Sequence, residues 1–261
     1  MLLRVYNDIK KYFSFIIYSA KATLKSEVSN SHLGWIWWIL EPLLFMFIYM
    51  FVGLVVFQKG EKYFAIFVFI GLSMWNFFNK GINNSIKTVQ RNSAIVGKVY
   101  IPKYILLLSD LCQLMIKMFI SFIIVFSMMI FYKVPISLNI LYFLPIILSL
   151  FMITLGISCI MLHFGVFVED LKNLITVGFR LLFYLTGIFY SIEKRVPKKW
   201  GNILLRANPI ACLIESCRKS LIYCETPARK LIVLWFFIGF ILSIIGIYII
   251  YKNENSYAKV M

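Results

Sequence analysis

Charged residues are scarce in this sequence, and acidic ones are the scarcest. Only 15% of the 261 residues are charged, and 11 Asp and Glu stand against 27 Lys and Arg. The hydrophobic share of 61% and the mean hydropathy of +0.86 lie far above those of ordinary soluble domains, in which roughly half of the residues are apolar. The composition excludes an ordinary soluble domain and predicts a chain that lives in a membrane.

The motifs of common catalytic sites are also missing. The Gly-Lys pair at residues 97–98 is followed by valine, and Asn92 stands where the first glycine of a G-x-x-x-x-G-K-[ST] loop belongs. Neither a G-x-S-x-G elbow nor an H-E-x-x-H helix occurs. We therefore expect no enzyme and no catalytic residue, since catalysis would depend on scattered groups: Glu41, Asp110, His163, Glu169 and Asp170.

Metal-binding spacing is absent as well. The five cysteines form no C-x-x-C pair, and an odd number cannot all pair within the chain. We interpret Cys112 and Cys159 as small buried apolar residues, whereas three others could form a bridge in an oxidising compartment: Cys212, Cys217 and Cys224. The two histidines lie far apart in sequence, so we expect no metal site.

Long apolar runs dominate what is present. Six runs approach the length of about 20 residues that an α-helix needs to cross a bilayer, and none alternates strictly as a β-barrel strand would. They predict an all-α integral membrane protein with one transmembrane domain over residues 1–261 and both termini on one side. The predicted spans are residues 33–57, 64–78, 111–132, 140–167, 174–192 and 231–251.

The first 30 residues are polar enough to differ from these runs. Apolar residues recur at spacings of three and four from Leu2 to Ala20, and most lysines of the segment occupy the other side. The pattern predicts a helix lying in the membrane surface, either as a simple anchor or with its basic side toward anionic headgroups. With cytoplasmic termini, 13 basic residues fall inside and 12 outside, so charge does not decide orientation.

A polar segment, residues 83–98, connects the second and third runs and is longer than a simple turn needs. It is either a solvated basic linker or a surface helix of three or four turns that docks on a cytoplasmic partner through three apolar residues. Those residues are Ile86, Val89 and Ile95. Pro102 is expected to end any helix before the next run.

Five stretches carry a resemblance that covers nearly the whole chain. They are "LGWIWWILEPLL" (33–44), "GLSMWNFF" (71–78), "NSAIVGKVYIPKYILLLSDL" (92–111), "FVEDLKNLI" (167–175) and "VPKKWGNILLRANPIACLIESCRKSL" (196–221). In this order they resemble the membrane permeases of bacterial ABC exporters for O-antigen, capsular polysaccharide or teichoic acid. Two positions depart from the pattern: Glu169 stands where many relatives have arginine, and Gly187 where proline is common.

The resemblance implies an inner-membrane homodimer with six spans per subunit, cytoplasmic termini and two copies of a separate ABC ATPase, which would bind ATP and magnesium. No cofactor is expected on this chain. The other implied partners are a lipid-linked polysaccharide and membrane lipids, with no nucleic acid. The implied contacts with the ATPase lie in the coupling helix at 83–98 and in a short second segment: Ile86, Val89, Arg91, Asn92, Ile95, Lys98, Glu169 and Asp170.

Residues 193–230 correspond to a segment that folds back into the outer face in this family. Local chemistry agrees, because Asn208 and Pro209 form a good helix start and Glu215 faces Arg218 and Lys219 at helical spacing. Nine basic residues in this segment would make a basic outer mouth. Such a mouth suits a polymer that carries phosphate or carboxylate, and it suits anionic lipid of the outer leaflet equally well.

Glu41 is an acidic residue inside an apolar run. A charge near the centre of a span costs about 2.5–3.5 kcal/mol on insertion scales, so it normally faces protein or water. We expect Glu41, beside the helix-kinking Pro42, to lie at the cytoplasmic entrance and to pair with Lys117 or Arg180 or to contact substrate hydroxyls. A carboxylate at headgroup level is the alternative.

Aromatic residues allow two interpretations. They are interface anchors, or they line a substrate path on which sugar rings stack. The candidates are Trp35, Trp38, Tyr49, Trp75, Phe78, Tyr184 and Tyr190. Two alternatives to polysaccharide export also follow from the sequence: an ABC exporter of a small amphiphile, and a membrane acyl- or glycosyltransferase that uses Asp110 or His163 with Asp170.

Overall fold

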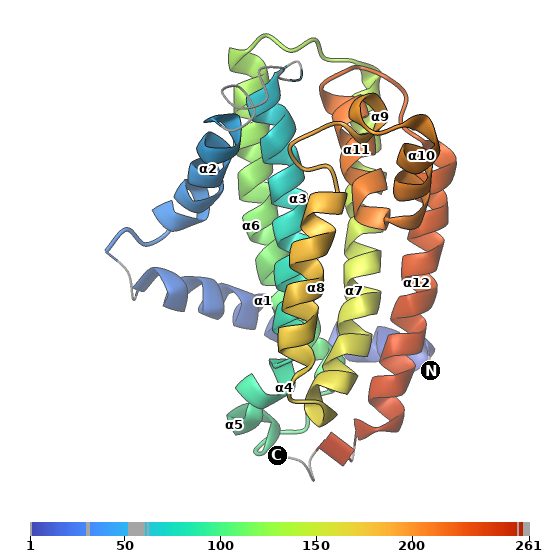
Figure 1. Ribbon diagram of the computed structural model, residues 1–261. Helices are drawn as coiled ribbons and strands as arrows, with labels where there is room; N and C mark the ends of the chain where they lie inside the picture. The colour runs from blue at the N-terminus through green and yellow to red at the C-terminus, as the bar shows by residue number, and fades with distance from the viewer. Residues whose placement is uncertain (1, 30–31, 52–60, 62, 255, 258–261) are drawn as a thin grey trace.

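The computed structural model describes residues 2–29, 32–51, 61, 63–254 and 256–257 and is built of helices (Figure 1). No strand occurs among the described residues, so the all-α prediction is confirmed. In chain order the helices are α1 (Leu2–Ser29), α2 (Ile36–Phe51), α3 (Phe64–Ser85), α4 (Thr88–Arg91), α5 (Ser93–Val96), α6 (Lys103–Phe131), η2 (Leu138–Tyr142), α7 (Phe143–Phe167), α8 (Leu171–Leu185), α9 (Ile192–Arg195), α10 (Lys198–Ala207), α11 (Pro209–Leu221) and α12 (Arg229–Lys252).

Four helical segments are long and apolar enough to cross a membrane: Phe64–Ser85, Lys103–Phe131, Leu138–Phe167 and Arg229–Lys252. The chain is therefore a multi-pass membrane protein by length and composition. The other two predicted spans correspond to the shorter helices α2 and α8, of 16 and 15 residues. Residues 52–57 of the first predicted span lie outside the described residues, and the count of six spans stays a prediction.

The ends of several spans differ from those predicted. The second span, predicted at 64–78, continues to Ser85, and the third, predicted from 111, begins at Lys103 directly after Pro102. Proline fits just before or at the start of a helix, where its missing N–H leaves no bond unmade. The fifth run was predicted to reach 192, but α8 ends at Leu185 and the chain turns at Gly187, whose φ is +68°.

Helices α7 and α12 pack backbone against backbone. A Cβ on Gly239 of α12 would lie 2.6 Å from the backbone nitrogen of Ile153, and one on Gly246 would lie 2.5 Å from the Cβ of Cys159. Ser243, between them, donates a hydrogen bond to the carbonyl of Met152 at 3.1 Å. Small residues let membrane helices approach closely enough for such contacts, so α7 and α12 form the most tightly joined pair of the bundle.

Helix α1 lies across the long helices rather than along them (Figure 1). Its buried residues Ile16, Ala20 and Leu24 recur every four positions and face the bundle. Tyr6 and Phe13, which belong to the predicted apolar side, are 65% and 58% exposed. The predicted amphipathic helix is therefore present, and its exposed aromatic rings suit the interfacial position that the sequence predicts.

The short helices gather at the two ends of the bundle: α4 and α5 at one end, α9 and α10 at the other (Figure 1). The prediction of one helix with three or four turns over residues 83–98 is wrong. The segment beyond α3 forms two four-residue helices that meet at Asn92. The Asn92 side chain donates to the carbonyl of Thr88 at 2.8 Å, the kind of local bond by which asparagine competes with a continuous helix.

Candidate functional site

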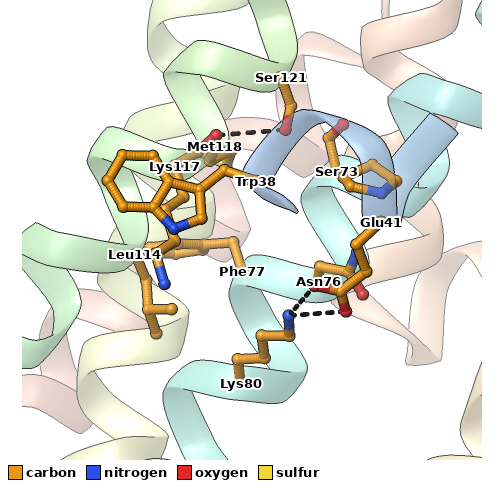
Figure 2. Close-up of a pocket in the computed structure, with 11 residues that line it drawn as sticks. Trp38, Glu41, Ser73, Asn76, Phe77, Lys80, Leu114, Lys117, Met118 and Ser121 are labelled. Atoms are coloured by element: carbon orange, nitrogen blue, oxygen red, sulfur yellow. Dashed lines mark hydrogen bonds and ion pairs between the residues drawn. The ribbon is translucent and has the colours of Figure 1, made fainter. Parts of the chain in front are cut away.

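A pocket lies between α2, α3 and α6, and Glu41 lines it (Figure 2). Lys80 of α3 donates to both oxygens of the Glu41 carboxylate, at 3.1 and 3.3 Å. The expected partners Lys117 and Arg180 are therefore wrong. Both side chains of the observed pair remain about half exposed, at 46% for Glu41 and 45% for Lys80. A polar group that enters the pocket can therefore reach the carboxylate and the ammonium group.

Lys117 lines the same pocket, but another carboxylate binds it. Its ammonium group donates to Glu27 at 2.5 Å, and Gln113 donates to the other oxygen of Glu27 at 2.7 Å. Trp38 donates its indole N–H to Glu27 at 3.2 Å. The end of α1 is thus tied to both α6 and α2. The sequence did not show this connection, because it depends on how α1 crosses the bundle.

The pocket combines groups that suit a polar ligand with rings. Ser73 and Asn76 of α3 line it beside Lys80, and Trp38 and Glu41 of α2 line the facing side. Carboxylates accept hydrogen bonds from hydroxyl groups, ammonium groups donate to hydroxyls or phosphates, and an indole offers a flat apolar face. Pro42 of α2 is buried and lines the pocket as well. These groups are of the kinds that bind hydroxyls, phosphates and sugar rings.

An aromatic groove lies between α3 and α8. Its ring centroids are close: Trp75 to Phe183 5.6 Å, Trp75 to Phe179 6.0 Å, and Phe78 to Phe179 5.4 Å. Arg180 lines this groove rather than the Glu41 pocket. Trp75 and Phe78 are buried, at 4% and 3% exposure. Neighbouring rings cover their faces, so their part in a substrate path stays a prediction.

The other aromatic candidates differ in exposure. Tyr184 is 62% exposed at the end of α8, and Tyr190 donates its hydroxyl to the carbonyl of Tyr184 at 2.8 Å. Trp35, just before α2, is 58% exposed. The side chain of Tyr49 lies outside the described residues. Of the predicted path residues, Trp35 and Tyr184 thus have the rings most accessible to a ligand or to lipid.

At the end of the bundle that carries α4 and α5, α4 binds the long helix α6. Thr88 donates to the Asp110 carboxylate of α6 at 2.8 Å, and Arg91 forms an ion pair with the same carboxylate. Gly165 of α7 lies so close to the loop after α3 that a Cβ on it would clash with the carbonyl oxygen of Ile86. Movement of α4 and of the loop before it is therefore linked to α6 and α7.

Two predicted docking residues do not reach the surface. Ile86 and Val89 are 2% and 1% exposed, so their assignment as contacts for a partner is wrong. They face the bundle because α4 is pinned to α6 through Asp110. Ile95 is 39% exposed, and the polar candidates on this surface are exposed too: Arg91, Lys98, Glu169 and Asp170. Asn92 is half-buried.

Two of the three residues proposed for a transferase, Asp110 and His163, have structural partners, whereas Asp170 is exposed. Asp110 binds α4, and His163 Nδ1 lies 2.8 Å from the hydroxyl of the fully buried Tyr257. All five cysteines are free thiols, and the described residues contain no group of three His, Cys, Asp or Glu that could hold a metal ion. Near the α4–α5 end of the bundle, burial and a hydrogen bond to the Glu254 carboxylate raise the pKa of the Tyr100 hydroxyl to about 12.

The segment after α8 contains the predicted cap and ion pair. Asn208 accepts hydrogen bonds from the N–H groups of Ile210 and Ala211, at 3.1 and 3.3 Å, and Pro209 is the first residue of α11. Glu215 and Arg218 lie 3.6 Å apart. Lys219, the other expected partner of Glu215, instead donates to Glu193 at 2.7 Å.

Arg218 is 1% exposed and does not belong to a basic surface, contrary to the sequence interpretation. Its guanidinium donates to three backbone carbonyls, those of Phe67 at 3.1 Å, Gly187 at 2.8 Å and Ile188 at 2.6 Å. Burial lowers the pKa of Arg218 to about 10 and raises the pKa of Glu215. The side chain thus joins α11, α3 and the turn after α8, a role that no sequence spacing indicates.

Comparison with known proteins adds family information to this geometry. The sequence model of a family described as ABC-2 type transporter matches residues 15–222. Two proteins of Klebsiella pneumoniae, both named O-antigen export system permease protein RfbA, are 26% and 28% identical over 262 residues, covering 100% of both chains. A protein of the same name from Myxococcus xanthus is 22% identical over 219 residues, which are 82% of this chain and 83% of that protein.

Proposed function

Because the chain belongs to the ABC-2 type transporter family, we propose that it is the membrane subunit of an ATP-driven exporter of a lipid-linked polysaccharide. The full-length similarity to two O-antigen export permeases is the observation that carries this proposal. O-antigen or a capsule-like polymer is the proposed substrate class. The chain itself is a transport permease and not an enzyme.

The proposed exporter contains two copies of this chain and two copies of a separate ABC ATPase that binds ATP and magnesium. The absence of a phosphate-binding loop from the sequence supports a separate ATPase. In this arrangement the chain lies in the bacterial inner membrane, crosses it six times and keeps both termini in the cytoplasm. The segment from α9 to α11 then folds back into the outer face.

The proposed ATPase contact is the end of the bundle that carries α4 and α5. Exposed Ile95 and Lys98 supply apolar and basic contacts, and Glu169 and Asp170 supply acidic ones. A push on α4 would reach α6 through Asp110 and α7 through Gly165, since the structure links α4 and its neighbouring loop to both helices. Ligand-driven closure of a partner can produce such a rigid-body movement.

The proposed substrate contact is the pocket of Glu41 and Lys80. A sugar hydroxyl can donate to Glu41, a phosphate can accept from Lys80, and Trp38 can stack against a sugar ring. The groove between α3 and α8, with Tyr184 at its exposed end, is the proposed path for the rest of the polymer. An ion pair this exposed contributes at most about 1 kcal/mol to stability in water, so binding rather than folding is its proposed task.

Substitution Glu41→Gln tests this assignment. The amide cannot hold the ammonium group of Lys80 as a carboxylate does, so we expect polymer export to fall severalfold while the amount of protein in the membrane stays unchanged. Export is measured as surface glycan per copy of the exporter. Glu225→Gln is the matched control, because Glu225 is exposed and has no ion pair among the described residues. Equal export by both variants would contradict a role for Glu41.

A further inference from the structure

The nine basic residues between 193 and 230 fall into two groups. Four have partners within the fold: Lys194 and Arg195 pair with Glu61 at 2.7 and 3.9 Å, Lys219 pairs with Glu193, and Arg218 is buried. The other five have no carboxylate partner among the described residues, which include every acidic residue of the chain. They form what we call the α10–α12 basic surface: Lys198, Lys199, Arg206, Arg229 and Lys230.

Four of these five charges stand at positions that the fold itself disfavours, whereas Arg206 lies in the last turn of α10, where a cation is favoured. Lys198 and Lys199 lie in the first turn of α10, and Arg229 and Lys230 lie in the first turn of α12. The amino-terminal end of a helix carries partial positive charge, so cations there cost free energy and acids are favoured. Neither first turn contains an acid. Among the described residues, one contact offsets part of this cost: the guanidinium of Arg229 lies 5.1 Å from the centre of the Tyr142 ring.

Two large apolar side chains are exposed on the short helix α10. Trp200 is 61% exposed and Ile203 is 47% exposed, and residues three apart lie on one face of a helix. Gly201 is buried against the rest of the protein. Tryptophan is enriched where a membrane meets water, so α10 has the composition of a helix that lies in a membrane surface.

The middle and end of α10 lie beside the start of α12, near an exposed apolar band. Asn202 and Arg206 of α10 line one hollow together with Ala228 and Leu231 at the start of α12. Directly after Lys230, the helix α12 exposes Val233 at 53% and Phe237 at 56% on a span of high hydropathy. Because each helical residue advances about 1.5 Å, Arg229 and Lys230 stand about one turn above this apolar band, at headgroup level.

We propose that the α10–α12 basic surface binds the phosphate groups of anionic phospholipid in the leaflet at this end of the bundle, with Trp200 and Ile203 inserted beside them. Five cations face one unpaired carboxylate at this end, Glu225, which leaves a clear surplus for anionic lipid. The inference does not depend on the exported substrate or on which way the chain is oriented in the membrane.

Lipid bound to the α10–α12 basic surface would help to position the helices α10 and α11. Helix α10 is followed directly by the Asn208 cap of α11. Arg218, on α11, holds the carbonyls of Gly187 and Ile188 after α8. Anionic lipid held by α10 would therefore act directly beside α11, whose Arg218 binds the turn that follows α8.

The test uses the purified full chain in phosphatidylcholine nanodiscs that contain a minor fraction of photoactivatable phosphatidylglycerol or, in parallel, photoactivatable phosphatidylcholine. We expect phosphatidylglycerol to label residues 198–206 and the start of α12, and unlabelled phosphatidylglycerol to compete. One basic residue near an anionic surface strengthens binding about fivefold. The double variant Lys198→Gln/Lys199→Gln should therefore lower this labelling by at least severalfold, whereas Lys198→Arg/Lys199→Arg should retain it.

The matched control is Lys87→Gln/Lys172→Gln, which removes two exposed lysines near the α4–α5 end and should leave labelling of residues 198–206 unchanged. Equal labelling by the two photolipids would overturn the proposal, because it would indicate mere contact with the bilayer. Unchanged labelling of the glutamine double variant would overturn it as well. Competition by a soluble anionic polysaccharide, but not by phosphatidylglycerol, would assign the surface to a polymer and overturn the lipid assignment.

Discussion

At the scale of single residues, Arg218 shows which contacts offset the cost of burying a charge. Its guanidinium donates to three carbonyls and lies 3.6 Å from the carboxylate of Glu215, which in turn accepts from Ser191 at 3.2 Å. A buried charge is stable only when hydrogen bonds and an opposite charge replace the water it loses. Three separate parts of the chain are joined by this one side chain.

Substitution Arg218→Leu should therefore destabilise the folded protein by about 3–5 kcal/mol, because it leaves Glu215 buried without its partner. Lysine at this position should be intermediate, since it keeps the charge but cannot reach three carbonyls with a planar fork. The measurement is thermal unfolding of the purified protein in detergent. Arg206→Leu, a change of an exposed arginine on the adjacent helix, is the control. A stability loss equal to that of the control would refute the role of Arg218.

Two local residue-level predictions from the sequence are confirmed, although Lys219, the other expected partner of Glu215, pairs with Glu193. The Asn208–Pro209 cap and the Glu215–Arg218 pair depend on spacings of one to three residues, which a helix converts into contact without any tertiary information. The partner of Glu41 is Lys80 rather than Lys117, because α1 brings Glu27 to Lys117. Such partner exchange depends on the packing of α1, which periodicity alone does not determine.

At the scale of helices, the packing of α7 on α12 depends on the absence of side chains. Gly239→Ala would bring a methyl group to 2.6 Å from the backbone nitrogen of Ile153, and backbone cannot move aside cheaply. We expect this change to separate the two helices and to lower the stability of the folded chain by about 1–3 kcal/mol, the usual cost of overpacking. Thermal unfolding of the purified variant measures the effect.

Gly178→Ala in α8 is the matched control for this prediction. A Cβ at Gly178 meets nothing within 4 Å, and alanine favours a helix over glycine by about 0.5–1 kcal/mol. The control should therefore be neutral or slightly stabilising. If Gly239→Ala is as stable as Gly178→Ala, then close backbone contact does not hold α7 and α12 together.

Helix-level prediction succeeded for the cores of the spans and failed at their ends. Hydropathy located α3, α6, α7 and α12, because an apolar run in lipid has to form a helix that satisfies its own backbone. The early end of α8 is followed by the turn at Gly187, whose carbonyl accepts a hydrogen bond from Arg218 of the distant helix α11. The break of the 83–98 segment at Asn92 depends on a side-chain bond to the backbone that a helical pattern does not indicate.

At the scale of the whole molecule, polar groups gather in two regions along the bundle, and apolar helices connect these two regions. The region near α1 contains the Glu41–Lys80 and Glu27–Lys117 pairs, and the far end contains Arg218 and the α10–α12 basic surface. Asp110 and Gly165 connect the α4–α5 end to α6 and α7, and glycine contacts connect α7 to α12. A movement applied at α4 can thus reach the far end through packed helices.

Membrane character and family could be predicted from composition and from five stretches in order, because both are distributed over the whole chain. The composition alone indicates the bilayer as solvent, and the ordered stretches indicate the permease family. The crossing of α1 and the burial of Ile86, Val89 and Arg218 could not be predicted. These features arise from contacts between parts of the chain that are far apart in sequence.

The most direct test of the proposed export function is to delete the gene and locate the long-chain glycan with a specific probe, first on intact cells and then on permeabilised ones. Loss of surface glycan with polymer accumulating inside, reversed by the wild-type gene, is the predicted result. Normal surface glycan in the deletion strain, with no second exporter active in that strain, would contradict polysaccharide export by this protein.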